Sequence, residues 1–305
     1  MDAEFRKWPN DDLQRGIMYM VIASFSFALT GACARYLRSD INPIELVLFR
    51  NIIGVGFIVY SLIQKPADAL GGKIGLLIFR GVIGTLALYT FFYGISKIGL
   101  AIAITYQQSY PVFLSVMAIF LLGEKLIFRE WTAIIIGFVG ICLIFLPSVD
   151  SSQLTLKHHL LGISNAVMTG MAYMSIRGLS KYYDQRTIIL SFMLSGIILP
   201  VISLSLGSVE EFPQIDFFIQ KFDTPKMEHI SVILLLGIAA LVGQVYLTKA
   251  FSYQKTGVIA AVGYSNIVFS IIFGTMLGDA FPDVLSMTGI LLIIICGVMV
   301  SFKKN

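Results

Sequence analysis

Charged residues are scarce in this sequence: Asp, Glu, Lys and Arg make up 13% of its 305 residues, whereas 57% are hydrophobic. Soluble proteins carry about a quarter charged residues, because a compact body must present a hydrated surface. Together with a mean hydropathy of +0.84, the scarcity of charge excludes an ordinary soluble domain. We therefore expect a protein that lies within the lipid bilayer.

The sequence also lacks a concentration of positive charge and a cysteine framework. Its net charge of +4 is distributed over many loops, which gives no basic patch for nucleic acid. The three cysteines, Cys33, Cys142 and Cys296, lie in apolar runs, where thiols behave as small hydrophobic groups. No disulfide pattern or metal-ligand spacing follows from them. We expect no metal site, no cofactor and no nucleic-acid partner.

The apolar runs show no residue pattern typical of a catalytic site. No carboxylate or histidine falls in the middle of one, and the HExxH and GxSxG patterns are absent. Acid–base and nucleophilic chemistry require such groups, so the sequence argues against an intramembrane enzyme. A proton relay within a membrane usually needs them too. Proton coupling therefore has no support, although the ionisable groups at the ends of the runs are open to that role.

Ten apolar runs of membrane-spanning length follow one another along the chain, each bounded by polar residues, glycine or proline. A helix needs about 20 mainly apolar residues to cross the bilayer. We place the runs at 16–36, 43–63, 74–95, 98–121, 129–147, 159–179, 187–206, 230–252, 256–277 and 282–302. The predicted fold is an all-α integral membrane protein with ten transmembrane helices.

Lys and Arg in the short loops predict the orientation, because they are enriched on the cytoplasmic side of membrane proteins. With the N-terminus inside, most of them fall on that side, and Arg80 is counted among them. Both termini are then cytoplasmic. The expected location is the bacterial inner membrane.

The two halves of the chain carry an internal repeat. Residues 94–124 read GISKIGLAIAITYQQSYPVFLSVMAIFLLGE, and residues 250–279 read AFSYQKTGVIAAVGYSNIVFSIIFGTMLGD. Because each copy has five spans, an odd number, the second copy must be inverted, which puts a substrate site near the bilayer midplane. The predicted organisation is a cytoplasmic tail at 1–15, a first repeat at 16–147, a connecting loop at 148–158, and a second repeat at 159–302 with a long outer loop near 207–229.

Each half closes its fourth helix with glycine and an acidic residue, Gly123-Glu124 and Gly278-Asp279. In this pattern the chain resembles the drug/metabolite transporter superfamily, specifically the EamA-type transporters with two tandem repeats. Family members move amino acids, nucleotide-like metabolites, metallophores and drugs, so the resemblance implies a transporter without naming its substrate. It also draws attention to Arg50 and Pro111. The second half departs from the family pattern, because Asn266 stands in place of the usual proline.

Polar side chains inside the predicted spans are candidates for substrate binding, because each must be satisfied by protein, water or substrate. The fourth span carries the run TYQQSYP at 105–111, and the ninth carries GYSN at 263–266 in the corresponding place. Pro111 frees a backbone carbonyl one turn earlier. For serine and threonine we favour the alternative, that they hold helices together. The candidate site residues are Arg50, Tyr89, Tyr93, Gln107, Gln108, Tyr110, Tyr173, Gln244, Tyr264 and Asn266.

Arg50 is nearly the only charge that we place well inside a span. It lies seven residues after Pro43, which is about 10 Å along a helix. Two interpretations are open. Either the side chain extends to the outer interface or pairs with Glu45, or it binds a substrate carboxylate or phosphate through two hydrogen bonds.

The long outer loop contains a second candidate element. Ile215, Phe218, Ile219 and Phe222 follow one another at helical spacing between two prolines. This spacing predicts a short amphipathic helix on the membrane surface. We expect it to act as an anchor, with a lid over the outer mouth as the alternative.

These observations predict a secondary transporter that works by alternating access. The expected substrate is a small polar metabolite, such as an amino acid, another zwitterion or a carboxylate-bearing compound, and export is favoured. Uptake of a metabolite and flipping of a lipid-linked substrate are the alternatives, since a polar passage serves each. The expected partners are the substrate and the lipid bilayer, and the chain is expected to be a monomer or a homodimer.

Overall fold

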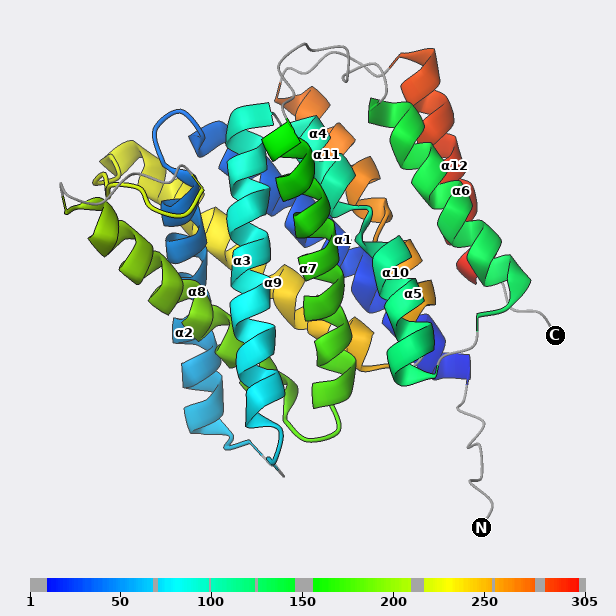
Figure 1. Cartoon of the computed structure of the whole chain (residues 1–305), viewed down its shortest axis with the longest axis horizontal. Coiled ribbons are helices and arrows are strands. Elements are labelled where there is room, and N and C mark those ends of the chain that lie inside the picture. Colours follow the sequence, from blue (N-terminus) through cyan, green and yellow to red (C-terminus); the bar gives the residue numbers. More distant parts are fainter. Residues whose placement is uncertain are drawn as a thin grey trace.

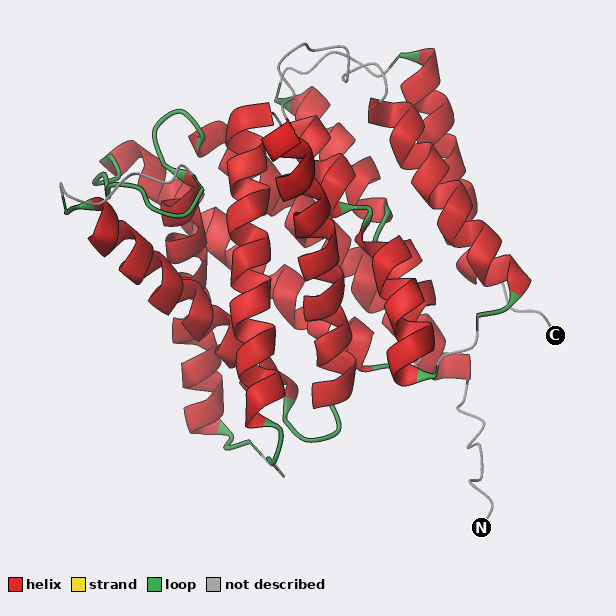
Figure 2. Ribbon diagram, in the orientation of Figure 1, coloured by secondary structure: helices red, strands yellow, loops and turns green. Residues whose placement is uncertain are grey.

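The computed structural model describes residues 10–67, 71–98, 100–123, 126–145, 156–209, 217–253, 256–277 and 283–301, and all regular structure in these ranges is helical (Figure 2). A 3-10 helix, η2 (Met227–His229), precedes α9. The α-helices are α1 (Asn10–Leu37), α2 (Pro43–Gln64), α3 (Ile74–Ile98), α4 (Leu100–Gln107), α5 (Tyr110–Leu122), α6 (Phe128–Phe145), α7 (Leu156–Leu179), α8 (Gln185–Gly207), α9 (Ile230–Ser252), α10 (Thr256–Val262), α11 (Ser265–Met276) and α12 (Val284–Ser301).

Helices of membrane-spanning length dominate the structure. Shorter apolar helices cover Tyr110–Leu121 and Met287–Cys296. Each predicted span is occupied by one helix or, in two cases, by two consecutive helices. The prediction of an all-helical membrane protein is therefore confirmed. Six stretches of the described chain are long and apolar enough to cross a membrane: Leu13–Leu37, Pro43–Gln64, Ile74–Lys97, Gln185–Gly207, Met227–Ser252 and Thr256–Met276.

The start of α2 shows how local sequence fixes a helix that carries a candidate site residue. Pro43 occupies the first turn, where its missing N–H is not needed. The Asn42 side chain accepts a hydrogen bond from the Glu45 N–H at 2.9 Å, and the Glu45 carboxylate accepts one from the Asn42 N–H at 3.4 Å. This capping box satisfies backbone donors at the helix end and sets the register that places Arg50 about two turns further along.

The fourth predicted span is broken in its middle, between α4 and α5. The backbone tightens at the break, where the Ser109 N–H donates to the Tyr106 carbonyl three residues earlier at 3.1 Å. Pro111, in the first turn of α5, explains the break because it has no N–H to donate to the carbonyl of Gln107.

The ninth predicted span is broken in the same way, between α10 and α11. Here the Gly263 N–H donates to the Ala260 carbonyl at 2.9 Å, again three residues earlier. No proline accompanies this break, since Asn266 stands opposite Pro111 in the repeat. The two breaks nevertheless fall at equivalent positions of the repeat, and each leaves two residues outside the flanking helices.

The packing of the helices follows the correspondence between the two halves (Figure 1). In the predicted repeat, α1 corresponds to α7, α2 to α8, α3 to α9, α4–α5 to α10–α11, and α6 to α12. Several contacts between two helices have a counterpart between the corresponding helices of the other half. The contact of α1 with α9 is matched by that of α7 with α3, and the contact of α3 with α8 by that of α9 with α2. The contact of α1 with α11 is likewise matched by that of α7 with α5. Corresponding helices also pack on each other, α2 on α8 at one end of the bundle and α6 on α12 at the other.

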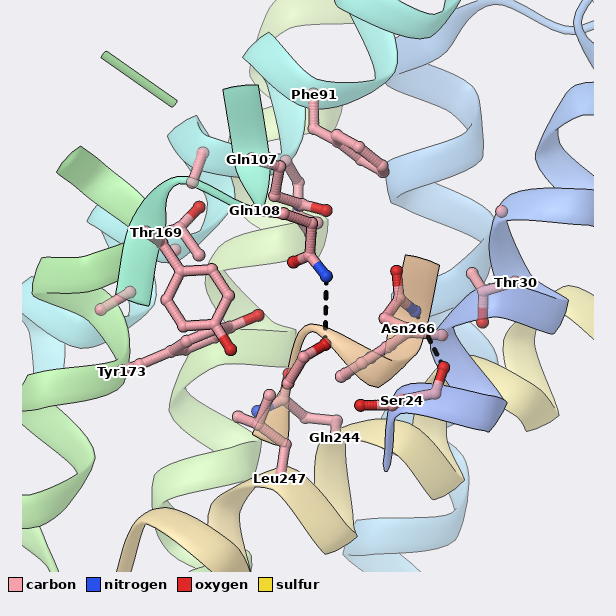
Figure 3. Close-up of a pocket in the computed structure, with 18 of the residues that line it drawn as sticks. Ser24, Thr30, Phe91, Gln107, Gln108, Thr169, Tyr173, Gln244, Leu247 and Asn266 are labelled. Carbon is pink, nitrogen blue, oxygen red and sulfur yellow. Dashed lines mark hydrogen bonds between the residues drawn. The ribbon is translucent and has the colours of Figure 1, made fainter. Parts of the chain in front are cut away.

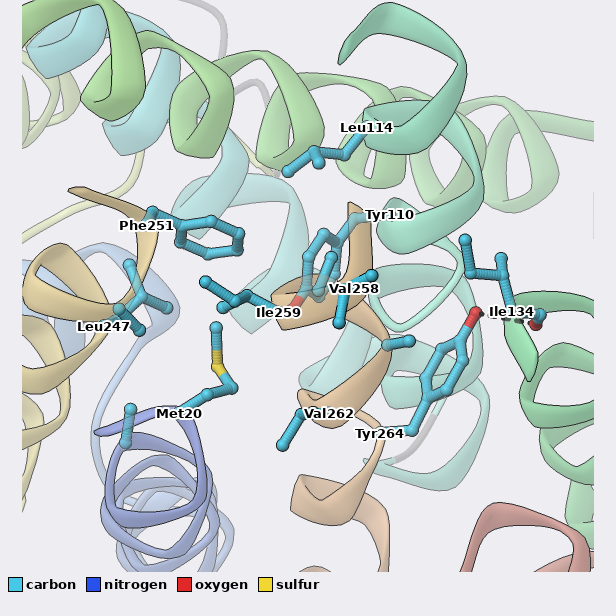
Figure 4. Close-up of a cluster of buried hydrophobic side chains, with 14 of the residues drawn as sticks. Met20, Tyr110, Leu114, Ile134, Leu247, Phe251, Val258, Ile259, Val262 and Tyr264 are labelled. Atoms are coloured by element: carbon cyan, nitrogen blue, oxygen red, sulfur yellow. Dashed lines mark hydrogen bonds between the residues drawn. The ribbon is translucent and has the colours of Figure 1, made fainter. Parts of the chain in front are cut away.

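A large cluster of buried hydrophobic side chains fills the bundle beside the two breaks (Figure 4). Met20, Leu114, Phe251 and Ile259 are each at most 2% exposed and bring α1, α5, α9 and α10 together. Tyr264 belongs to this cluster, and its hydroxyl donates to the Ile134 carbonyl of α6 at 3.4 Å. The cluster therefore holds the broken helices against the pair formed by α6 and α12.

The described end of the long loop, residues 217–226, contains no helix. The prediction of an amphipathic helix is wrong for these residues, and Ile215 lies outside the described chain. The rings of Phe217 and Phe218 pack on Tyr93 and Tyr89 of α3, with centroids 6.0 and 5.7 Å apart. Since successive helical residues point about 100° apart, two neighbouring side chains that both face α3 are better placed on an irregular segment.

Polar contacts hold the same segment on the corner between α1 and α2. The Glu45 carboxylate accepts the Asp223 N–H at 2.6 Å, and the Asn42 side chain donates to the Lys221 carbonyl at 3.0 Å. Lys226 donates to Asp40 at 3.0 Å, and this hydrogen bond lowers the pKa of the Asp40 carboxyl below its usual value. The segment therefore covers this end of α2, and its backbone is hydrogen-bonded to the Glu45 carboxylate.

Candidate functional site

A cavity lies in the middle of the bundle, where the two helix breaks approach each other. Its lining comes from both halves of the chain, including α1, α2 and α3 of the first half and α7, α8 and α9 of the second. No acidic residue is present in the described lining. Seven of the predicted site residues line it: Arg50, Gln107, Gln108, Tyr110, Tyr173, Gln244 and Asn266.

The remaining three predicted residues lie outside this cavity. Tyr89 is buried, and its hydroxyl lies 3.1 Å from that of Ser203. Tyr93 lines a smaller pocket and packs on Phe217 of the 217–226 segment. Tyr264 is buried in the cluster against α6. All three are tyrosines within predicted spans, and their positions in the sequence did not fix the direction of their side chains.

Hydrogen bonds join the two breaks to each other and to α1 (Figure 3). The Gln108 Nε2 donates to the Gly263 carbonyl at 3.1 Å, and these two residues occupy equivalent positions of the repeat. The Asn266 Nδ2 donates to the Ser24 carbonyl at 2.8 Å. Gly263 is required by this approach, because a methyl group there would overlap the Tyr110 hydroxyl.

Amides and aromatic rings supply the neutral part of the lining (Figure 3). The Gln107 side chain makes no hydrogen bond to the described residues, whereas Gln244 Nε2 lies 3.2 Å from Thr248 Oγ1. The rings of Tyr110 and Tyr173 meet edge to face at 5.0 Å, and Tyr173 stacks on Phe251 at 5.2 Å. The wall thus offers amide groups and ring faces but no negative charge.

Arg50 faces this cavity and neither extends to the interface nor pairs with Glu45. It is only 4% exposed, and its Nε is buried without a hydrogen-bond partner among the residues that the structure describes. Glu45 instead accepts the N–H groups of Asn42 and Asp223. Burying a single uncompensated arginine in a membrane helix costs about 2.5 to 3.5 kcal/mol on insertion scales. The cation contact with the Phe192 ring, at 5.9 Å, offsets part of that cost.

Arg80 is a second buried arginine, although its place in the sequence predicted a cytoplasmic charge. It is 1% exposed, lines the same cavity, and lies 4.4 Å from the centroid of the Phe192 ring. Within the described part of the chain, its Nε also has no hydrogen-bond partner. Arg80 lies six positions after Ile74, the first residue of α3, which is about 9 Å along the helix. At that depth, the position in the sequence does not show whether the guanidinium extends to the membrane surface or is buried in the bundle.

Comparisons with known proteins agree with this architecture. The EamA-like transporter family model matches residues 14–146. An uncharacterized transporter of Helicobacter pylori (strain J99) is 33% identical and is matched over 94% of both chains. The pseudopaline exporter CntI of Pseudomonas aeruginosa is 28% identical over 97% of this chain and 99% of its own. The S-adenosylmethionine uptake transporter of Rickettsia conorii is 22% identical over 92% of this chain and 90% of its own.

A solved crystal structure shares the fold. It covers 96% of this chain and 97% of its own, with a TM-score of 0.75 at 14% sequence identity.

Proposed function

The chain belongs to the EamA-like transporters of the drug/metabolite transporter superfamily, and we propose that it carries a small carboxylate-bearing metabolite. It is a multi-pass transporter of the cell membrane rather than an enzyme. The observation that carries the proposal is Arg50, a buried cation in a central cavity that pairs with no described residue. A guanidinium binds a carboxylate through two parallel hydrogen bonds. The amides of Gln107 and Gln108 and the Tyr110 and Tyr173 rings contact its neutral groups.

Transport proceeds by alternating access between two inverted repeats, at 16–147 and 159–302, with both termini in the cytoplasm. The exchange of packing partners between the halves and the equivalent positions of the two helix breaks support this arrangement. Broken helices at the interface of inverted repeats form substrate sites in other transporters, with free backbone groups at the break. The meeting of Gln108 with Gly263 puts equivalent residues together, as expected close to a twofold axis.

A small soluble substrate is favoured over a lipid-linked one. A flippase needs a groove that opens sideways to lipid, whereas four of the polar side chains in this lining are almost completely buried. Arg50, Gln108, Tyr110 and Gln244 are each at most 4% exposed. Export is the proposed direction, as in the relative named an exporter, although another relative is named an uptake transporter.

Metabolite profiling of cells that lack or overproduce the protein tests this function. We expect one carboxylate-bearing compound to rise in the cytosol and fall in the medium when the protein is absent, and the reverse on overproduction. Opposite changes would show uptake. A cargo without an acidic group, or a change confined to lipid-linked compounds, would contradict the proposal.

Tyr89 provides a test of which tyrosines belong to the site. Tyr89→Phe removes the hydroxyl that lies against Ser203, so we expect a loss of stability of about 1 kcal/mol with an unchanged KM for the cargo found by profiling. Thermal unfolding of the purified protein and transport in proteoliposomes measure the two effects. If Tyr89→Phe raises the KM several-fold without loss of stability, Tyr89 contacts the substrate.

A further inference from the structure

We infer that the substrate carries two acidic groups and that Arg80 binds the second one. This inference rests on the proposed function, in which Arg50 binds one carboxylate. It adds a binding residue and narrows the substrate class to compounds with two acidic groups and a net charge of −2.

The position of Arg80 is built into the packing of α3. A methyl group on Gly84, one turn further along the helix, would overlap Nη1 of Arg80 and lie 2.9 Å from the Phe192 ring. The absence of a side chain at Gly84 therefore leaves room for the guanidinium to lie along the helix, against the ring of Phe192 at 4.4 Å. A side chain that merely extended to the membrane surface would not require this space.

The two arginines share one aromatic ring and have no counter-charge among the described residues. Phe192 lies within 6 Å of both guanidinium carbons, so its ring face serves two cations. Among the described residues neither arginine makes a salt bridge or a hydrogen bond, and none of the described cavity lining is acidic. Because arginine keeps its charge at all physiological pH values, the pair stays doubly positive and uncompensated in a buried site.

A substrate with one negative charge neutralises only one of the two arginines, whereas a substrate with two negative charges neutralises both. The lining also determines which other groups the site accepts. The described lining offers no carboxylate to an ammonium group, and Gln107, Gln108 and Gln244 provide neutral hydrogen-bonding groups. The site therefore selects for acidic groups and tolerates hydroxyl or amide groups between them.

Matched pairs of small acids test the inference on the purified full-length protein. The probes are the linear dicarboxylates from malonate to adipate and the half-amide of each, which differ by one charge at nearly the same size. Binding is measured by calorimetry at constant ionic strength. A charge-assisted hydrogen bond changes affinity by about 10- to 100-fold, so we expect a dicarboxylate of the right length to bind at least about tenfold more tightly than its half-amide.

Variants of Arg80 and Gly84 then assign the second site. We expect Arg80→Gln to reduce the ratio between dicarboxylate and half-amide to about one while half-amide affinity changes less than about threefold, because Arg50 still holds one carboxylate. Gly84→Ala keeps the charge but displaces the guanidinium, and is expected to lower the ratio as well. Arg80→Lys is expected to keep part of it.

The outcomes separate this inference from the proposed function. Equal binding of dicarboxylates and half-amides by the wild type, with a ratio that Arg80→Gln does not change, would overturn the second acidic site and leave the Arg50 site standing. Failure of every carboxylate to bind would overturn both. A ratio lost in Arg80→Gln and retained in Arg80→Lys supports the inference even if Gly84→Ala is poorly folded.

Discussion

Replacing Arg50 with glutamine is expected to lower transport of the acidic cargo by about 10- to 100-fold while the protein remains folded. The factor corresponds to the loss of a charge-assisted hydrogen bond, about 1.5 to 3 kcal/mol. Stability should not fall, since Arg50 makes no salt bridge or hydrogen bond with described residues and its removal relieves a buried charge. Transport in proteoliposomes, normalised to inserted protein, measures the first effect, and thermal unfolding measures the second.

Lys249→Gln is the matched control for Arg50→Gln. Lys249 also carries a positive charge in a span, but its ammonium lies over the rings of Tyr246 and Tyr19, at 5.2 and 5.7 Å, and it does not line the cavity. We expect this variant to transport within about twofold of wild type, because a partly exposed cation contact is worth about 0.5 to 1 kcal/mol to the fold. Wild-type rates in Arg50→Gln, or an equal loss in both variants, would refute a direct role of Arg50.

Hydropathy predicted the helices of this protein well, because a membrane restricts spanning segments to helices of nearly fixed length. The break after α4 was also predictable from the sequence, since Pro111 removes a backbone donor from a fixed position. The break after α10 was not, because Gly263 and Asn266 are compatible with a continuous helix. That break depends on packing against Tyr110 and on the tether from Asn266 to α1, which are tertiary contacts.

The candidate site divides in a similar way. The amides of Gln107, Gln108 and Gln244 were predicted to belong to the site because a buried amide without a partner is costly, and the cavity lining includes all three. Tyr264 was selected by the same logic and lies elsewhere, because a tyrosine ring packs among apolar groups and needs only one partner for its hydroxyl. Arg80 was missed because its burial follows from Gly84 and Phe192, which sequence spacing does not bring together.

Because Gly263 lies at the contact between the two breaks, Gly263→Ala is expected to cause the second large loss of transport. The added methyl group overlaps the Tyr110 hydroxyl and lies 2.8 Å from the Ala260 carbonyl, so the arrangement in which the breaks meet becomes less stable by about 1 to 3 kcal/mol. If transport passes through this arrangement, its rate falls by about 5- to 100-fold. Transport in proteoliposomes and thermal unfolding both report the change.

The decisive measurement is the coupling between Gly263→Ala and Tyr110→Phe. Phenylalanine keeps the ring that packs on Tyr173 and removes only the oxygen that the methyl group meets. We therefore expect the double variant to recover part of what Gly263→Ala loses, with a coupling free energy of about 0.5 to 3 kcal/mol. The single effect of Tyr110→Phe on substrate binding cancels in the cycle. Additive losses would show that the two breaks move independently, and the close approach of Gly263 to Tyr110 would then have no part in transport.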